Sequence, residues 1–158
     1  VTLDKLYKNN GDGTFREAAA SEGIVGDYSK QAAAFGDYDN DGFIDIVVLP
    51  SYFTGDSRIH LYKNQGNQNH WLTIQLIGTK SNRDSIGARI TLKAGGKKQI
   101  REVTAGSSFI SQNSLWQTFG LGKTKIVKEI EIRWPSGIKK VLKNIRTDQK
   151  IIVTEESN

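Results

Sequence analysis

Carboxylates alternate with other residues in one short segment of the chain, residues 37–45. They stand at positions 1, 3, 5 and 9 of that segment, as Asp37, Asp39, Asp41 and Asp45. A hard cation such as Ca²⁺ takes roughly 6–8 oxygen ligands at about 2.3–2.6 Å, and alternate spacing in a tight loop turns such side chains onto one centre. Gly42 supplies the sharp turn at position 6, and Phe43 at position 7 offers its backbone carbonyl. The segment therefore predicts a Ca²⁺ site built from these four side chains, the Phe43 carbonyl and water.

The chain that follows this segment does not read as a helix, although the nine residues match the start of an EF-hand loop. Residues 46–49 are β-branched or apolar, and Pro50 comes next. The twelfth position is Val48, where an EF-hand needs a bidentate glutamate. The sequence therefore predicts a calcium loop between two strands.

The alternative for this loop is a solvated acidic turn that binds no ion. Carboxylates this close repel one another, at roughly 4 kcal/mol for a pair about 4 Å apart at an effective dielectric of about 20. A bound divalent cation is the simplest way to offset that repulsion. Mg²⁺ suits the segment less well, because it prefers a small octahedral site and keeps several waters.

Composition excludes several classes of site. The chain has 158 residues, enough for one large domain or two small ones, and no cysteine. A disulfide framework, a zinc–thiolate site and a thiol nucleophile are therefore ruled out. No apolar run reaches the roughly 18 residues of a membrane helix, so we do not expect a transmembrane protein, and the first residues do not resemble a signal peptide. Because the chain begins at Val1, we expect a processed piece or a fragment of a longer protein.

Charge divides the chain into two parts. Residues 1–66 carry six Lys or Arg and ten Asp or Glu, whereas residues 67–158 carry sixteen and seven. Such a split favours two units with different surfaces, which we place at residues 1–66 and 67–158. The basic part would suit an anionic partner such as an acidic glycan or lipid headgroups, or it is only a solubilising surface. We do not expect nucleic acid, because the basic residues are dispersed and no nucleic-acid motif accompanies them.

One short repeat is visible in the first part. The residues Leu-Tyr-Lys-Asn at 6–9 recur at 61–64, each followed two residues later by glycine. A period near 50 residues is typical of solenoids, propellers and arrays, and several short strands per repeat indicate a propeller blade. We expect strands near residues 14–17, 31–35, 44–49 and 59–63.

The first part resembles FG-GAP/VCBS-type repeats, the calcium-loop blades of integrin-like β-propellers. The resemblance is carried by residues 35–48, Phe-Gly-Asp-Tyr-Asp-Asn-Asp-Gly-Phe-Ile-Asp-Ile-Val-Val, and by the two Leu-Tyr-Lys-Asn segments. It implies that Asp37, Asp39, Asp41, Asp45 and the Phe43 carbonyl hold Ca²⁺. A family propeller has about seven blades, so this chain would hold only a fragment of one, and open blade edges would invite pairing with another chain.

The second part reads as all-β, with about seven strands and no long amphipathic helix. Turn signals separate the strands at Gly95-Gly96, at residues 120–122 and at residues 135–137. Strands of this number favour an antiparallel β-sandwich or a partly open barrel. We interpret the three tryptophans, Trp71, Trp116 and Trp134, as core anchors; the alternative is a platform on which a sugar stacks.

The second part resembles the ASPIC/UnbV domain, whose family is named partly for an acidic cartilage protein. The carriers are Asn-His-Trp-Leu at 69–72, residues 81–89, residues 101–103, Gly-Ser-Ser-Phe-Ile-Ser-Gln-Asn at 106–113, Phe-Gly-Leu-Gly at 119–122 and Trp-Pro-Ser-Gly at 134–137. This resemblance implies an exported or extracellular protein, secreted or associated with the cell envelope. It does not imply a biochemical activity.

Two function classes remain open on the sequence. The first, which we favour, is an exported calcium-binding module for binding or adhesion to a protein or glycan partner, with a structural metal and no catalysis. The second is a hydrolase or a carbohydrate-processing enzyme with its site in the loops of the second part or in propeller blades outside this chain. Polar runs there would line such a pocket: Ser81, Asn82, Arg83, Asp84, Ser108, Gln112 and Asn113. Neither histidine, His60 nor His70, has a context that places it beside a serine, and the serine elbow motif of hydrolases is absent.

Overall fold

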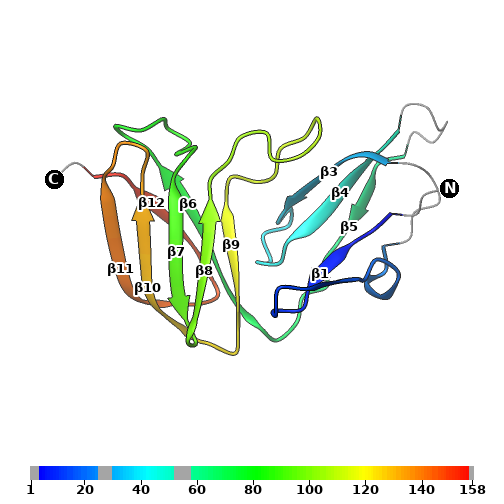
Figure 1. Cartoon of the computed structure of the whole chain (residues 1–158), viewed down its shortest axis with the longest axis horizontal. Coiled ribbons are helices and arrows are strands. Elements are labelled where there is room, and N and C mark those ends of the chain that lie inside the picture. Colours follow the sequence, from blue (N-terminus) through cyan, green and yellow to red (C-terminus); the bar gives the residue numbers. More distant parts are fainter. Residues whose placement is uncertain (1–3, 25–29, 52–57, 157–158) are drawn as a thin grey trace.

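The computed structural model describes residues 4–24, 30–51 and 58–156. These residues form β-sheets joined by turns, with one short 3-10 turn, η1 (Ala20–Glu22) (Figure 1). The all-β prediction is confirmed. We refer to strands β1 to β5 as the first unit, to strands β6 to β12 as the second unit, and to residues 63–69 between them as the linker. That they are two domains with a boundary after residue 66 stays a prediction.

The first unit holds a hairpin and a three-stranded sheet. β1 (Tyr7–Asn9) and β2 (Phe15–Glu17) pair in antiparallel fashion across a turn in which Gly11 and Gly13 have φ of 87° and 90°. The sheet has the order β3-β4-β5, all antiparallel, with β3 (Lys30–Gly36), β4 (Asp45–Pro50) and β5 (His60–Tyr62). These strands agree with those expected from the sequence, and the acidic segment is the connection between β3 and β4.

The second unit consists of two sheets. The larger sheet has the order β11-β10-β7-β8, with β7 (Arg89–Ala94), β8 (Lys97–Glu102), β10 (Ile126–Arg133) and β11 (Lys139–Arg146). The smaller sheet has the order β12-β6-β9, with β6 (His70–Ile77), β9 (Gln117–Gly122) and β12 (Gln149–Thr154). The two sheets face each other across an apolar core in an open arrangement (Figure 1).

Alternating side chains of these strands make the core. Ile90 and Leu92 on β7, like Leu72 and Ile74 on β6, are fully buried. Each such side chain gains about 1.5–3 kcal/mol when it leaves water. The core cluster runs from Leu72 to Val153, and no described residue of the first unit belongs to it. The second unit therefore has a hydrophobic core of its own.

We expect the second unit to fold without the first. Because all described residues of its core cluster belong to this unit, a chain of residues 67–158 should give the dispersed amide spectrum of a folded protein. The first unit alone should not, since its sheet is small and its buried apolar residues are few. Two-dimensional NMR of the two separate pieces checks both statements. A collapsed spectrum for residues 67–158 would show that the first unit completes the core.

Three details differ from the sequence-based prediction. Residues 120–122 lie within β9 and not in a turn, because Gly120 and Gly122 pair with β6. β12 pairs with β6 in parallel, while the other strand pairs of the second unit are antiparallel. Among the tryptophans only Trp134, which is 1% exposed, belongs to the core cluster; Trp71 and Trp116 are half-buried. The prediction of three core anchors was therefore wrong for two of them.

A loop of the second unit covers part of the open edge of β3. The Ser111 hydroxyl donates to the Ala33 carbonyl at 2.8 Å, and the Phe35 amide donates to Asn113 Oδ1 at 2.9 Å. The Ser114 amide donates to the Phe35 carbonyl at 2.9 Å. The edge that was expected to invite another chain is thus partly occupied by this chain.

Candidate metal centre

Backbone amides donate to the carboxylates of the acidic loop, residues 37–44. The Gly42 amide donates to Asp37 Oδ2 at 3.0 Å, and the Phe43 amide donates to Asp41 Oδ1 at 2.9 Å. Asn40 and Gly42 have φ of 64° and 92°, in the left-handed region that asparagine and glycine tolerate best. The residue types of the segment therefore explain its tight turn.

The turn brings three of the predicted side chains together. Asp37, Asp39 and Asp45 each place a carboxylate oxygen within 4.8 Å of the others. The Asp45 residue is 2% exposed and the Asp37 side chain 6%. Asp41 is exposed and lies outside this group of three. That Asp41 and the Phe43 carbonyl bind an ion stays a prediction.

One oxygen in this group has a feature that points to a ligand. Asp37 Oδ1 is buried and has no hydrogen-bond partner among the described residues. A buried carboxylate oxygen without a partner is costly, and such groups are rare unless an ion or water satisfies them. The Asp45 oxygens, by contrast, accept from the Asn64 amide at 2.8 Å and from the Tyr38 amide at 3.1 Å. The donor set is all oxygen, as a Ca²⁺ site requires, and the residues fit that ion.

Two lysines, which the sequence analysis did not identify, contact the carboxylates. Lys63 donates to Asp39 Oδ2 and lies 3.9 Å from Asp41 Oδ2. This hydrogen bond lowers the pKa of Asp39 and raises the pKa of Lys63. Lys150, on β12 of the second unit, places Nζ 2.9 Å from Asp37 Oδ2. Lys150 lies 110 residues from Asn40, which it also contacts, so no spacing in the sequence indicates it.

Ser81, the first residue of the polar run at 81–84, contacts a buried glutamate. Glu155 is 1% exposed and accepts from the amides of Thr79, Lys80 and Ser81 at 2.8–2.9 Å. The hydroxyls of Ser81 and Ser136 donate to its other oxygen. These bonds make Ser81 a partner of Glu155, a residue that the sequence analysis did not identify.

Asn82 and Arg83 of the same run form local hydrogen bonds in a turn. The Asn82 side chain donates to the Ile86 carbonyl and accepts from the Ile86 amide, at 2.9 and 2.8 Å. Arg83 contributes its carbonyl to the Gly78 amide, and Asp84 is exposed. A ligand role for this run stays a prediction.

The second polar run lies in the loop that covers β3. Gln112 spans that loop, donating to the carbonyls of Thr104 and Asn113 and accepting from the Gly106 amide. Gln112 and Asn113 also line a cleft of about 330 Å³ that reaches Ile44 at the end of the acidic loop. Ser81 to Asp84 do not line this cleft, so the two predicted runs do not join in it.

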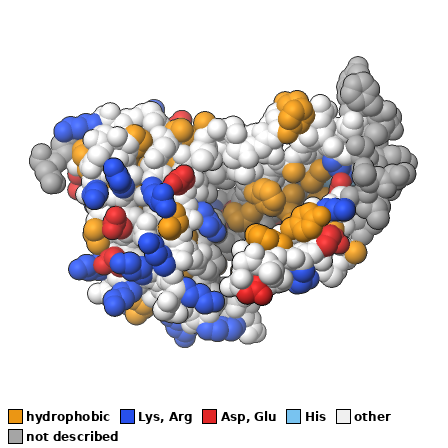
Figure 2. Space-filling view, in the orientation of Figure 1, with side chains coloured by type: hydrophobic (Ala, Val, Ile, Leu, Met, Phe, Trp, Pro, Cys, Tyr) orange, Lys and Arg blue, Asp and Glu red, His pale blue; other side chains and the backbone are white. Residues whose placement is uncertain are grey.

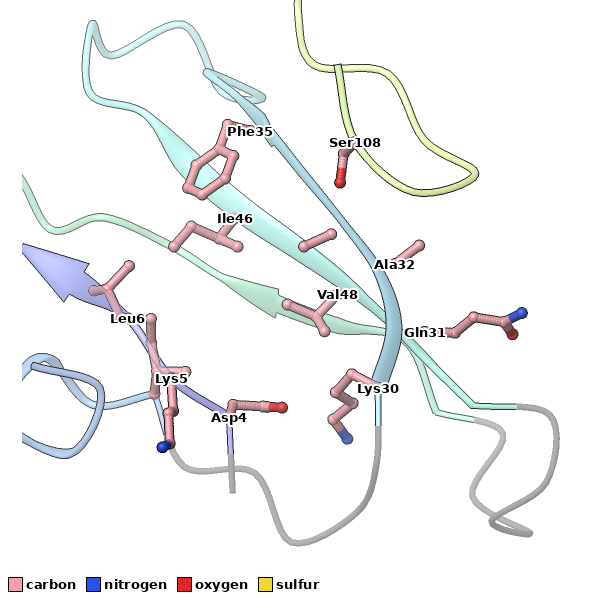
Figure 3. Close-up of a pocket in the computed structure, with 12 residues that line it drawn as sticks. Asp4, Lys5, Leu6, Lys30, Gln31, Ala32, Phe35, Ile46, Val48 and Ser108 are labelled. Carbon is pink, nitrogen blue, oxygen red and sulfur yellow. The ribbon is translucent and has the colours of Figure 1, made fainter. Parts of the chain in front are cut away.

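Ser108 lines a different hollow, on the face of the first unit's sheet. Figure 3 shows Phe35, Ile46 and Val48 beside this hollow of about 260 Å³, with Ser108 on the loop across from them. The walls are mainly apolar, and Asp4, Lys5 and Lys30 lie near one end. Ser108 therefore lies beside apolar side chains and not in a polar pocket.

The basic residues of the second unit are spread over its larger sheet. Figure 2 shows lysine and arginine interspersed with acidic side chains there. Several form ion pairs, as Lys93 does with Glu129 at 2.8 Å and Arg89 with Glu102 at 3.0 Å. Such mixed, paired charge favours a solubilising surface over a dedicated anion site.

Across the described ranges, no helix has the length and apolar character needed to cross a membrane.

Comparison with known proteins supports both resemblances. Residues 78–158 match the family model described as ASPIC and UnbV, and residues 3–48 match an FG-GAP-like repeat model. The chain is 23% identical over 153 residues to a protein of Mus musculus named cartilage acidic protein 1. That match covers 95% of this chain and 23% of the relative, so the chain spans about a quarter of that protein's length.

Proposed function

Because the chain belongs to the ASPIC and UnbV family, we propose that it is a binding or adhesion module of an extracellular protein, with a structural Ca²⁺ ion in its acidic loop. One observation carries the calcium role: the buried Asp37 Oδ1, without a partner among the described residues, beside the oxygens of Asp39 and Asp45. The FG-GAP-like repeat and a relative named for cartilage support an extracellular, calcium-dependent protein.

The residues that would hold the ion are the predicted ones. Asp37, Asp39 and Asp45 would supply carboxylate oxygens, and Asp41 and the Phe43 carbonyl would complete the shell with water. A bound Ca²⁺ supplies positive charge that offsets the repulsion of the carboxylates. No reacting group is required for this role, which fits a structural ion.

Contacts of the polar side chains favour binding over hydrolysis. His70 Nδ1 lies 2.7 Å from Asp148 Oδ2, and among the described residues no serine hydroxyl hydrogen-bonds to this imidazole. The hydroxyls of Ser81 and Ser111 bond to Glu155 and to the Ala33 carbonyl. A nucleophilic serine needs a base within hydrogen-bond reach that can take its proton. The hydroxyls of these two serines instead donate to structural acceptors, a buried carboxylate and a backbone carbonyl. We therefore propose a protein or glycan partner and no catalysis.

We expect calorimetric titration with CaCl₂ to release or absorb heat with one ion bound per chain. A ligand that binds only the folded form stabilises it by about 2.7 kcal/mol at a hundredfold excess over Kd. The melting temperature should accordingly be higher in CaCl₂ than in EDTA. Asp37→Asn should remove both effects, because it replaces the partnerless oxygen and a unit of charge.

Asp12→Asn is the matched control, since Asp12 is an exposed acid in the β1–β2 turn whose carboxylate accepts hydrogen bonds from Thr14 and from no described residue of the acidic loop. It should keep the heat and the difference in melting temperature. If the unmodified chain gives neither heat nor a shift in melting, the loop is a solvated acidic turn and the calcium proposal is rejected.

A further inference from the structure

The acidic loop contacts the second unit at two places. Gly42 is buried beneath the Trp71 side chain, and a Cβ at Gly42 would overlap the indole ring. Lys150 places Nζ 2.9 Å from Asp37 Oδ2 and donates to Asn40 Oδ1 at 2.5 Å. Since Trp71 lies on β6 and Lys150 on β12, two neighbouring strands of one sheet lie against the loop.

The linker between the units also lies on this loop. The Asn64 amide donates to Asp45 Oδ1 at 2.8 Å, and its side chain donates to the Ile44 carbonyl at 3.2 Å. Gly66 packs against the Phe43 ring so closely that a Cβ there would lie 2.6 Å from it. The loop therefore holds the start of the linker as well as the face of the second unit.

The two oxygens of Asp37 have different surroundings. Oδ2 accepts from the Gly42 amide and from Lys150, whereas Oδ1 has no partner among the described residues. A cation on Oδ1 and Lys150 on Oδ2 can bind one carboxylate together. The three loop carboxylates and Asp45, with Lys63 and Lys150, leave two uncompensated negative charges, which one divalent cation neutralises. Lys150 and the ion can therefore bind Asp37 at the same time, each on a different oxygen.

We infer that a divalent cation in the acidic loop fixes the second unit against the first, with Lys150 as the residue that couples ion binding to docking. The inference rests on the calcium role proposed above. An ion that orders the loop in the shape that receives Trp71 and Lys150 binds the docked form more tightly. By linkage, the same ion favours docking by the same factor.

The absence of cysteine allows a direct measurement of docking. Gln31→Cys on β3 and Lys97→Cys on β8 are exposed positions, one on each unit, for a pair of spin labels. Pulsed electron resonance then gives the distribution of distances between the units of the whole chain, in EDTA and in CaCl₂. We expect CaCl₂ to raise the ratio of docked to undocked molecules by about fivefold or more, the lower end of usual coupling.

Lys150→Met tests the coupling residue, since methionine keeps the apolar stem and removes the ammonium group. This variant should still bind Ca²⁺ in the calorimeter, but CaCl₂ should no longer raise its ratio of docked to undocked molecules. Lys139→Met, on β11, makes the same change of charge away from the loop and should behave like the parent.

The outcomes separate the two proposals. Calcium heat with an unchanged distribution would overturn the coupling and leave the calcium role intact. A distribution that broadens in CaCl₂ would also overturn it, because the ion would then displace Lys150. No heat in the parent chain would reject the calcium role, and the coupling with it.

Discussion

Phe119→Ala is expected to lower the free energy of unfolding of the second unit by about 3–5 kcal/mol. Phe119 is fully buried on β9, pairs with Leu72 of β6, and lies under the Arg101 guanidinium at 5.4 Å from the ring centroid. Truncation removes the ring from the core and leaves a cavity that the two sheets cannot close. Urea unfolding, followed by tryptophan fluorescence, measures the loss.

Ile126→Ala is the control for that measurement. Ile126 is 54% exposed at the start of β10, so its truncation should change the unfolding free energy by no more than about 0.5 kcal/mol. Phe119→Leu should lie between the two and remain folded if the alanine variant does not. Equal unfolding midpoints for Phe119→Ala and Ile126→Ala would show that β9 does not pack as described.

Glu155→Gln is expected to lower the melting temperature at neutral pH by about 5 °C or more. Burial alone would raise the pKa of Glu155, but hydrogen bonds from Ser136, Ser81 and Thr79 outweigh it and lower the pKa to about 2. Glutamine can keep one oxygen for the backbone amides of residues 79–81, but its NH₂ group would replace the oxygen that accepts from the Ser81 and Ser136 hydroxyls. The substitution therefore removes these two acceptor contacts and replaces a charged acceptor by a neutral one, and hydrogen bonds to charged groups contribute more to stability.

The lowered pKa of Glu155 predicts that the stability of the chain depends on pH. Because folding lowers the pKa of Glu155 below its usual 4.5, its contribution to stability is complete above about pH 5 and is lost as the pH falls toward about 2. Melting curves across this range should show a steeper decline for the parent chain than for Glu155→Gln. Glu156→Gln, a 70% exposed neighbour, is the matched control and should keep the steep decline. Parallel declines for all three chains would contradict the assignment.

Local signals in the sequence predicted the acidic loop well. Alternating carboxylates and Gly42 specify a turn whose hydrogen bonds are mostly short-range, such as that from Gly42 to Asp37. The flanking strands follow from β-branched residues that end at a proline. For such features, the residues that decide the structure are neighbours in the chain, so the spacing of residue types is sufficient to predict it.

Contacts between residues far apart in the sequence could not be predicted in this way. Residues 120–122 were predicted as a turn because glycine weakens strands, yet pairing with β6 outweighs that preference. Trp71 was predicted in the core, and only the fold shows that it covers Gly42. Lys150 resembled any other lysine of a basic segment until β12 brought it to Asp37. In each case the deciding partner is far along the chain and no spacing indicates it.

The parallel pairing of β12 with β6 affects how the second unit folds. His70, at the start of β6, bonds to Asp148, 78 residues further along the chain and just before β12. Closing so long a loop costs conformational entropy before the pairing returns any stability, and proteins dominated by such distant contacts fold slowly. Until β12 arrives, β6 presents an unpaired edge with Leu72, Ile74 and Leu76 beside it. The interval before that closure is therefore when the chain is most exposed to aggregation.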